Sequence, residues 1–332
     1  MSDPVQNPRV AVVCGGPAAE REVSLASGRE VANALRASFD DVTVHEPDLH
    51  LAEELLKGSI DVVFPALHGP LGEDGSIQGM LEVAGVPYVG SGVAASACAI
   101  DKVIAKRLFR DAGLPLAREV VVDRGAPGDP VASIRELLDG RVAVKPASQG
   151  SAVGVAFAET DDELAAALEA AFAFDERVLV EEFVVGAEIT VGILENPDAV
   201  PFPVIDIRTP GDSWYDFDHR YTVGLSEHII PAPLPEDVYD AVQDLAVQAH
   251  VTLGCRDLSR VDFVVEPGGR SVLLEVNTLP GMTPTSLYPD GAQAAGISFE
   301  QLTELLVNRA LSRGRARDEA RTAPPAAQPP VG

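Results

Sequence analysis

The segment from Arg260 to Leu287 constrains this chain more than any other, because its pattern predicts a β-hairpin with acidic side chains on one face. Two runs rich in Val, Leu and Phe flank the turn-forming sequence EPGGR at 266–270. With a four-residue loop at 267–270, the expected cross-strand pairs are Glu266–Ser271, Val264–Leu273, Asp262–Glu275 and Arg260–Asn277. Side chains alternate faces along a strand, so the last two pairs share one face.

Two carboxylates opposite each other on that face need a positive partner, because like charges in cross-strand register destabilise a sheet. Asp262, Glu275 and Asn277 offer the oxygen ligands that a hard cation such as Mg²⁺ takes, usually beside phosphate oxygens. The alternative interpretation is an exposed polar face on which Arg260 neutralises the acids. These residues alone leave both interpretations open.

Composition limits the classes of protein to which the chain can belong. With 332 residues, 46% of them hydrophobic, it is long enough for two or three globular domains. The net charge of −26 argues against nucleic acid and anionic membrane surfaces as partners. Cys14, Cys98 and Cys255 are far apart in apolar surroundings, which is typical of reduced core residues. With no long apolar run and no signal peptide, we expect a cytoplasmic protein that does not bind a membrane.

The first hundred residues alternate apolar strands with helical segments, a pattern that predicts an open parallel α/β sheet. The strands are expected at 9–14, 42–45, 62–65 and 86–89, with the first helix at 23–37. A Rossmann-type dinucleotide site is disfavoured, because GxGxxG is absent and Glu20 would repel a pyrophosphate. Glu20 can instead bind an ammonium group, or simply stabilise the helix N-terminus.

A glycine-rich loop, LHGPLGEDGSIQGML at 67–81, follows the strand at 62–65. Open α/β sheets place ligands at this edge of the sheet. His68, Glu73 and Asp74 can bind a metal, but no further ligand cluster accompanies them. We therefore favour the interpretation that these side chains order the loop by hydrogen bonding.

From residue 101 the pattern changes to a small α+β unit. Helices are expected at 101–112, near 134–138 and at 161–173, and strands at 119–122, 141–145, 153–158 and from 178. Lys145 ends a strand, and the small residues after it can bring backbone N–H groups close to phosphate oxygens. An ordinary hairpin connection is the alternative. Glu181 and Glu182 indicate a hinge that faces a cleft, and one glutamate of this segment either hydrogen-bonds a ribose or is exposed.

The C-terminal part combines a strand from 188 to 194, a long irregular segment, two helices and the hairpin. Residues 208–228 have no regular pattern, which is typical of a functional lid. Helices are expected at 236–253 and 298–313, and the Arg/Ala/Pro-rich tail at 314–332 is expected to be disordered.

Several spaced motifs, in this order, resemble those of a D-alanine–D-alanine ligase of the ATP-grasp superfamily over about residues 9–312. The motifs are GGPAAEREVSL (15–25), LHGPLGEDGSIQGML (67–81), GSGVAASACAIDK (90–102), KPASQGSAVG (145–154), YDFDHRY (215–221), SRVDF (259–263) and EVNTLPGMTPTSL (275–287). The resemblance implies a three-domain ATP-grasp fold, α/β and α+β, with an N-terminal open parallel-sheet domain. It implies the ADP-forming ligation of two D-alanines through a D-alanyl phosphate, for peptidoglycan precursor synthesis.

The domains expected from this resemblance are an N-terminal α/β substrate domain at 1–100, a central ATP-grasp subdomain at 101–184 and a C-terminal ATP-grasp and metal-binding domain at 185–313. The resemblance assigns nucleotide-binding roles to Lys102, Lys145 and Arg220 for the phosphates, Glu181 and Val184 for the adenine-side hinge and Glu188 for the ribose. It assigns two Mg²⁺ ions, or Mn²⁺ in their place, to Asp262, Glu275 and Asn277.

The resemblance also implies roles in binding and joining the amino acids. These are Glu20 for the first D-alanine ammonium, Ser151 and Tyr221 for loop closure, Arg260 and the Gly281 backbone for the acyl phosphate and oxyanion, and Ser286 and Leu287 for the second D-alanine carboxylate. A homodimer is expected from the resemblance only.

Three positions depart from the family pattern: Arg220 and Glu182 stand where lysine is common, and Ala18 where serine is frequent. An arginine still pairs with phosphate, bidentately. The alternative functions are a D-alanyl-D-lactate or D-alanyl-D-serine ligase, or a non-catalytic nucleotide-binding protein on the same fold. Tyr221 is similar to the tyrosine of members that make no depsipeptide, which favours D-alanine as the second substrate.

Overall fold

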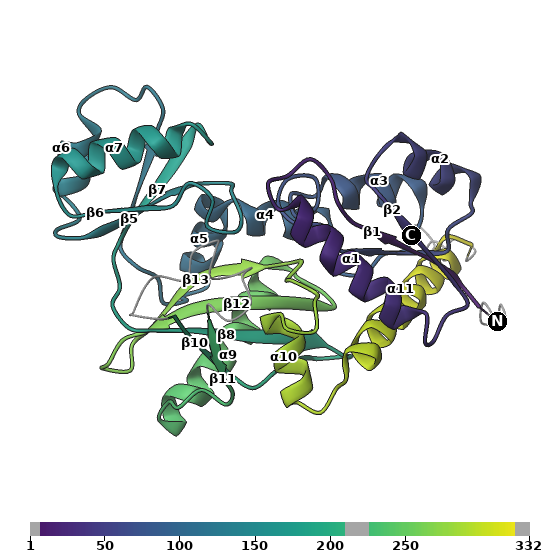
Figure 1. Cartoon of the computed structure of the whole chain (residues 1–332). Helices are drawn as coiled ribbons and strands as arrows, with labels where there is room; N and C mark the ends of the chain where they lie inside the picture. Colours follow the sequence, from purple (N-terminus) through teal and green to yellow (C-terminus); the bar gives the residue numbers. More distant parts are fainter. Residues whose placement is uncertain (1–6, 210–225, 323–332) are drawn as a thin grey trace, which may run out of the picture.

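The computed structural model describes residues 7–209 and 226–322, which form three sheets with helices packed around them (Figure 1). The N-terminal sheet is parallel, in the order β2-β1-β3. Its strands are β1 (Arg9–Val13), β2 (Asp41–His45) and β3 (Val62–Pro65), and its helices are α1 (Arg21–Leu35), α2 (Leu49–Lys57) and α3 (Ser76–Ala84). The predicted open parallel sheet is thereby confirmed.

The prediction of a fourth strand in this sheet, at 86–89, was wrong. Only one isolated parallel bridge forms there, between Val63 and Tyr88. Gly85 and Gly90 have φ values of 75° and 95°, which turn the chain on either side of the bridge and prevent a longer ladder. Tyr88 is nevertheless buried in the core.

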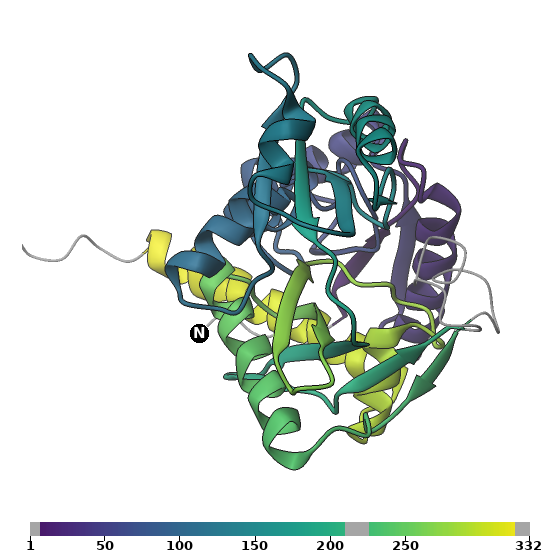
Figure 2. The ribbon, with the colours of Figure 1, turned by 90° about the vertical axis from the view of Figure 1, so that its left-hand side faces the viewer.

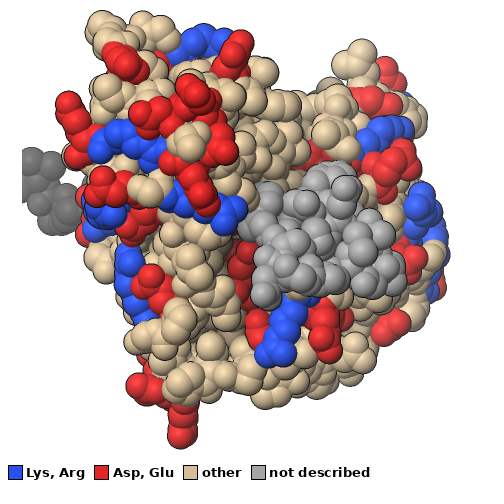
Figure 3. All heavy atoms as spheres, turned by 60° about the vertical axis from the view of Figure 1, so that its left-hand side comes forward, with Lys and Arg blue, Asp and Glu red and all other residues tan. Residues whose placement is uncertain are grey.

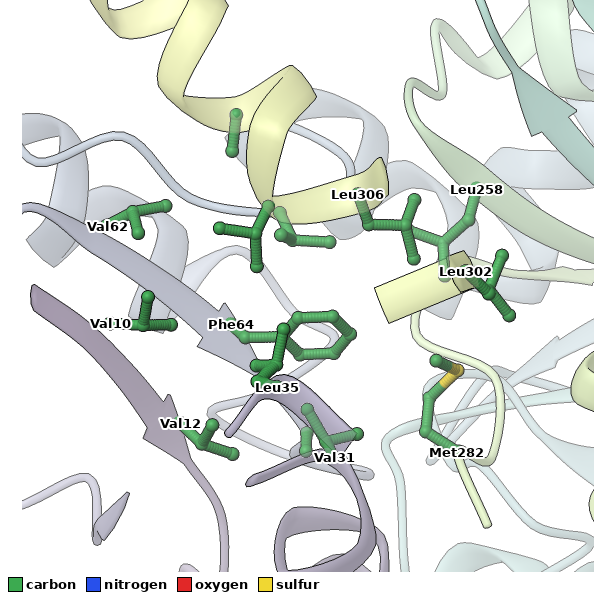
Figure 4. Close-up of a cluster of buried hydrophobic side chains, with 14 of the residues drawn as sticks. Val10, Val12, Val31, Leu35, Val62, Phe64, Leu258, Met282, Leu302 and Leu306 are labelled. Atoms are coloured by element: carbon green, nitrogen blue, oxygen red, sulfur yellow. The ribbon is translucent and has the colours of Figure 1, made fainter. Parts of the chain in front are cut away.

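The core of the N-terminal unit is completed by the last helix of the chain, α11 (Phe299–Thr322). Figure 4 shows Leu302 and Leu306 of α11 facing Phe64 of β3 and Leu35 of α1. Each fully buried side chain of this size contributes about 1.5–3 kcal/mol. Leu258 and Met282 join the same cluster from the C-terminal part of the chain, so the two units share a core.

Helix α11 also corrects the expectation of a disordered tail from residue 314, because it continues to Thr322. Its alanines, arginines and glutamates favour helix over coil. Arg317 anchors this extension by pairing with Glu82 at 3.0 Å and donating to the Gly85 carbonyl at 2.7 Å.

The central unit is an antiparallel sheet in the order β4-β7-β5-β6, covered by two helices. The elements are β4 (Glu119–Asp123), α6 (Pro130–Arg135), β5 (Val142–Pro146), β6 (Ala156–Ala158), α7 (Asp161–Phe172) and β7 (Arg177–Glu182). Helix α6 starts earlier than expected, because Asp129 accepts hydrogen bonds from Val131 and Ala132 and Pro130 occupies the first helical position. Strand β6 starts three residues later than expected.

The C-terminal sheet is antiparallel, in the order β11-β10-β8-β12-β13, with β9 on β8. The strands are β8 (Ala187–Glu195), β9 (Ala199–Pro201), β10 (Ile205–Arg208), β11 (Glu227–Ile229), β12 (Leu258–Val265) and β13 (Ser271–Asn277). Helix α9 (Glu236–Leu253) packs on the sheet through Val242, Ala246, Ala249 and Leu253, which follow the helical period. The remaining helices are α4 (Val93–Ile100), α5 (Lys102–Asp111) and α10 (Leu287–Ala294).

The three units meet at one place. Figure 2 shows the central sheet standing above the C-terminal sheet, with the N-terminal unit beside them. Helix α5 begins there, capped by Asp101, which accepts hydrogen bonds from the N–H groups of Val103 and Ile104. The mixed α/β and α+β class is as predicted, and the domain boundaries at 100, 184 and 313 remain predictions. Within the two described ranges, no helix has the length and apolar character to cross a membrane.

Candidate active site

A cleft of about 810 Å³ lies between the central sheet and the C-terminal sheet. Its walls come from separate segments of the chain, which the fold brings together from α5, β5, β7, β8, β10, β12 and β13. The predicted site residues that line it are Lys102, Lys145, Glu181, Val184, Glu188, Asp262 and Glu275. The fold therefore gathers the predicted nucleotide-binding and metal-binding residues around one space.

The hairpin of β12 and β13 forms the floor of this cleft with the register expected at its polar end. Asp262 pairs with Glu275 and Arg260 pairs with Asn277, as predicted. Towards the turn the prediction was wrong by one residue, since Val264 pairs with Val272. Two deviations from the predicted hairpin, one in the turn and one in β13, cancel each other before the polar end is reached.

The first deviation is a shorter turn, in which the Glu266 N–H donates to the Arg270 carbonyl at 2.9 Å. The second is a β-bulge at Leu274 that adds one residue to β13. The bulge leaves Leu273 in the hydrophobic core while Leu274 and Glu275 both line the cleft. The acids therefore end up opposite each other even though the turn is not the one expected.

Asp262 accepts hydrogen bonds on both of its carboxylate oxygens. Arg260 donates to its two oxygens at 2.9 and 2.8 Å, and Thr190 Oγ1 donates at 2.6 Å. The Asn277 amide nitrogen adds a bond of 3.1 Å. Each carboxylate oxygen of Asp262 thus accepts two hydrogen bonds, and Arg260 neutralises this acid as the polar-face interpretation expected.

The donor chemistry of the hairpin also suits a hard cation. Asp262, Glu275 and Asn277 present two carboxylates and an amide on one face, the oxygen ligands that Mg²⁺ prefers. Arg260 would have to release Asp262 for a cation to bind there. Across the described part of the chain, no three His, Cys, Asp or Glu side chains converge to hold an ion.

Lysines supply the opposite charge in the cleft. Lys102, the first residue of α5, donates to the Gln149 carbonyl at 2.6 Å and lies 3.5 Å from Glu275. Lys145, near the end of β5, lies 2.6 Å from Glu181. Burial opposes the charge of Lys145, but Glu181 raises its pKa above the ordinary value. Two ammonium groups thus lie beside the acidic hairpin.

Glu181 is buried in β7 and contacts two ammonium groups rather than solvent. Lys106 of α5 lies 2.5 Å from one oxygen and Lys145 lies 2.6 Å from the other. Burial by itself would raise the pKa of Glu181, but these two charges lower it to about 2. The sequence analysis placed Glu181 at the adenine-side hinge and did not single out Lys106. Lysine is scarce in this chain, and this scarcity was the signal that could have identified Lys106.

Val184 of the predicted hinge and Glu188, predicted to bind the ribose, both line the cleft, and their roles remain predictions. Glu182 lines the cleft as well, while its carboxylate accepts from Arg118 Nε at 2.7 Å and lies 3.2 Å from Arg270. These partners explain how an acid is accommodated where lysine is common.

The loop after Lys145 crosses towards the N-terminal unit. Ser151 and Ala152 have positive φ values of 49° and 61°, conformations uncommon outside glycine. A Cβ built on Gly150 would lie 3.4 Å from Glu20 and 3.6 Å from Glu73. The loop therefore joins the phosphate-side lysines to the candidate ammonium site at Glu20.

Glu20 and Glu73 form a buried acidic pair beneath this loop. Glu20 is 3% exposed, and Glu73 accepts a hydrogen bond of 2.8 Å from the Gly69 N–H. Burial raises the pKa of Glu73 to about 7, and Glu20 and Glu275 add to the rise. Asp74 accepts bonds of 2.9 Å from the N–H groups of Leu71 and Ser76, so the predicted loop-ordering role is confirmed.

The neighbouring His68 is also buried, and it lies between the acidic pair and the hairpin. Burial lowers its pKa to about 4, and the charge of Arg260 adds to this effect. Its ring contacts Ser27 Oγ at 3.4 Å. A neutral imidazole is therefore expected at this position near pH 7.

The predicted carboxylate site occupies the start of α10. Ser286 is the N-cap residue, and its Oγ lies 2.8 Å from Thr283 Oγ1. A Cβ on Gly281 would lie 3.0 Å from Ser286 Oγ, so the two segments are close. Unpaired N–H groups at a helix N-terminus favour a carboxylate. Arg220, Tyr221 and most of the predicted lid lie outside the described residues.

Comparisons with known proteins point in the same direction. The family profile described as D-ala D-ala ligase C-terminus matches residues 108–308, and that described as D-ala D-ala ligase N-terminus matches 40–91. A curated D-alanine–D-alanine ligase of Desulforamulus reducens is 44% identical over 312 residues, covering 92% of this chain and 99% of the relative. One from Trichlorobacter lovleyi is 45% identical over 317 residues, covering 95% and 99%.

A solved structure resembles the whole described fold. The crystal structure of D-alanine–D-alanine ligase from Bacillus anthracis complexed with ATP has a TM-score of 0.78 with this chain, at 30% sequence identity. The match covers 94% of this chain and 99% of that one.

Proposed function

This chain belongs to the D-alanine–D-alanine ligase family, and we propose that the cleft between its two antiparallel sheets is where it joins two D-alanines at the expense of ATP. The ligation serves peptidoglycan precursor synthesis. The observation that carries the proposal is the convergence of Lys102, Lys145, Asp262 and Glu275 on one cleft from four separate elements. Phosphoryl transfer needs positioned charge more than covalent help from the protein, and this convergence provides it.

The reaction proceeds in two transfers. A carboxylate oxygen of the first D-alanine attacks the γ-phosphorus of ATP, which releases ADP and leaves a D-alanyl phosphate. The amine of the second D-alanine, once deprotonated, then attacks the acyl carbon and displaces phosphate. Lys102 and Lys145 are proposed to bind the ATP phosphates as point charges within the cleft.

Arg260 has a proposed role in each of two arrangements. In the described arrangement it neutralises Asp262. Asp262, Glu275 and Asn277 would hold Mg²⁺, and Arg260 would face the acyl phosphate and the oxyanion, where a preorganised donor contributes about 3 kcal/mol. The ion would neutralise phosphate charge and orient the phosphoryl group. Two bound ions, and Mn²⁺ as a substitute, are part of this proposal.

The amino-acid ends are proposed to bind on either side of the acyl carbon. Glu20 takes the ammonium group of the first D-alanine, with Glu73 beside it. The start of α10 at Ser286 and Leu287 takes the carboxylate of the second, and the Gly281 backbone faces the oxyanion. Ser151, Tyr221 and Arg220 keep the loop-closing and phosphate roles that the resemblance implies, as predictions.

The decisive experiment measures phosphate release with ATP, Mg²⁺ and D-alanine, together with chromatographic detection of the dipeptide. We expect phosphate and D-alanyl-D-alanine in equal amounts, both lost when Mg²⁺ is omitted. ATP hydrolysis that does not respond to D-alanine would contradict the ligase proposal and favour a nucleotide-binding protein.

A parallel reaction with D-lactate or D-serine as the second substrate tests specificity at neutral pH. We expect the D-alanine product to dominate. A preference for D-lactate would overturn this specificity and leave the fold and ATP site unaffected. The homodimer and the cytoplasmic location also stay predictions, and sedimentation velocity measures the first of them.

A further inference from the structure

Lys106 is a buried lysine that no part of the proposed reaction uses. Its side chain is 1% exposed, although lysine is almost never fully buried unless it is paired. It lies one helical turn from Lys102 on α5, so the two lysines share one face of the helix. Lys102 reaches the cleft from the start of the helix, whereas Lys106 points into the protein behind the cleft.

The partner of Lys106 is the carboxylate of Glu181. The Lys106 ammonium lies 2.5 Å from Glu181 Oε1 and 3.4 Å from the Leu273 carbonyl of β13. Glu181 Oε2 lies 2.6 Å from Lys145. Glu181 is itself 2% exposed, and its oxygens have no hydrogen-bond partner of good geometry within the described chain. Charge pairing with the two lysines is therefore what compensates the buried carboxylate.

The three groups form a row from the interior to the cleft: Lys106, Glu181, Lys145. Glu181 and Lys145 both line the cleft, and Lys145 is the most exposed of the three, with 16% of its side chain exposed. Lys106 occupies one oxygen of Glu181, so Lys145 is left with the other. Without Lys106, both oxygens of a buried anion would have Lys145 as their nearest cation, and a two-oxygen contact would draw its ammonium group away from the cleft.

We propose that Lys106 is a positioning residue for ATP binding, which acts through Glu181 to keep the Lys145 ammonium available to the nucleotide phosphates. This inference rests on the proposed function, in which Lys145 binds ATP. It adds to that function a residue that touches neither nucleotide nor amino acid. The role depends on the charge of Lys106, because a neutral side chain of the same length cannot compete with Lys145 for Glu181.

The test is equilibrium binding of ATP in the absence of D-alanine, by calorimetry, on the full chain carrying Lys106→Met. We expect the Kd for ATP to rise about tenfold, which corresponds to about 1.4 kcal/mol. The KM for ATP should rise with it, while the KM for D-alanine stays within about twofold. Lys106→Arg should restore much of the binding, because it keeps the charge.

The matched control is Lys57→Met, which removes an exposed lysine that pairs with Glu54 on α2, away from the cleft. Its Kd for ATP should equal that of the unmodified chain. A purely structural role for Lys106 would lower the melting temperature and leave the Kd unchanged when binding is measured well below that temperature. That result would overturn the inference.

A second comparison remains decisive when Lys106→Met fails to fold. Lys106→Met combined with Glu181→Gln removes both charges of the buried pair, a change that proteins tolerate far better than breaking the pair. We expect the double variant to bind ATP as well as Glu181→Gln alone, because Lys106 acts through the charge of Glu181. Weaker binding by the double variant would show that Lys106 acts by another route.

These outcomes separate the inference from the proposed function. If the unmodified chain binds no ATP, the proposed function fails. If it binds ATP and Lys106→Met binds equally well, only the role of Lys106 fails.

Discussion

Two of the four lysines in this chain, Lys102 and Lys145, line one cleft, and a third, Lys106, is buried behind it. Lys102 and Lys145 were recognisable because each lies at a junction between elements. Lys106 was not, because a lysine four residues along an amphipathic helix usually lies on a solvated face. Lys106 is assigned to the interior by its partner Glu181 in β7. The sequence pattern of α5 does not reveal where Glu181 lies.

Glu73 provides a prediction at this scale, since burial raises its pKa to about 7 from an ordinary value of 4.5. Its contribution to stability is complete below about pH 4.5 and is lost as the pH rises through 7. A shift of this size corresponds to about 3 kcal/mol. Relative to the unmodified chain, Glu73→Gln should therefore gain about that much unfolding free energy between pH 4.5 and pH 8, as measured by urea denaturation without ligands.

Asp74→Asn is the control for that measurement, because Asp74 belongs to the same loop and its pKa is lowered rather than raised. It should show no relative gain between pH 4.5 and pH 8. Parallel stability curves for Glu73→Gln and the unmodified chain would contradict the assignment of a neutral carboxyl at Glu73.

At the scale of elements, the hairpin shows which structural features a sequence pattern predicts and which it does not. The polar end of its register was predictable, because alternation placed Asp262 and Glu275 on one face. The bulge at Leu274 was not predictable from the sequence. Leu273 and Leu274 both suit a buried strand in either register, and only packing decides which of the two enters the core. The pairing at the site was right because a shorter turn and a bulge compensate each other.

A prediction for an element concerns the end of β7, where Glu182 pairs with Arg118 and Arg270. Arg270 lies in the turn of the hairpin, so this acid links the end of β7 to the turn end of β12 and β13. Glu182→Lys would place three cations together and should lower the unfolding free energy by about 1 kcal/mol. Denaturant melts measure this, and turnover should change little because lysine is common at this position in the family pattern.

The charge-swapped pair Glu182→Lys with Arg270→Glu is the companion variant. It should recover part of the lost stability, because an opposite charge again faces residue 182. If the two substitutions were additive, Arg270 would not be a partner of Glu182 in solution.

At the scale of the whole molecule, a buried aspartate joins the N-terminal and C-terminal units. Asp257 is 0% exposed and adopts a φ of 62°, just before β12. It accepts from Arg313 at 2.7 and 2.8 Å and from the Gly90 N–H at 2.9 Å. These bonds connect the C-terminal sheet to α11 and to the end of the N-terminal unit.

Asp257→Ala should cost about 3 kcal/mol or more, because it leaves Arg313 and the Gly90 N–H without their buried acceptor. Asp257→Asn should cost less, since asparagine keeps an acceptor and tolerates a positive φ. Urea midpoints at constant slope measure both. Equal midpoints for Asp257→Ala and the unmodified chain would show that the units are held together by their shared apolar core alone.

The acidity of the molecule also belongs to this scale. Figure 3 shows acidic and basic side chains intermixed over one face, so the net charge of −26 is not gathered into a single patch there. Lys102 and Lys145, which are proposed to bind the ATP phosphates, line the cleft near Glu275 and Glu181. The net charge can be read from the composition, but only the fold shows which lysines come together in the cleft.

The packing of α11 against β3 and α1 has a consequence for how the chain is made. A ribosome delivers β1, α1 and β3 long before residues 302–311, which fill the remaining side of their core. An apolar face of the N-terminal unit therefore stays uncovered until the end of translation. A nascent chain stalled before α11 should be a substrate for chaperones, and release of the last helix should be the event that ends this exposure.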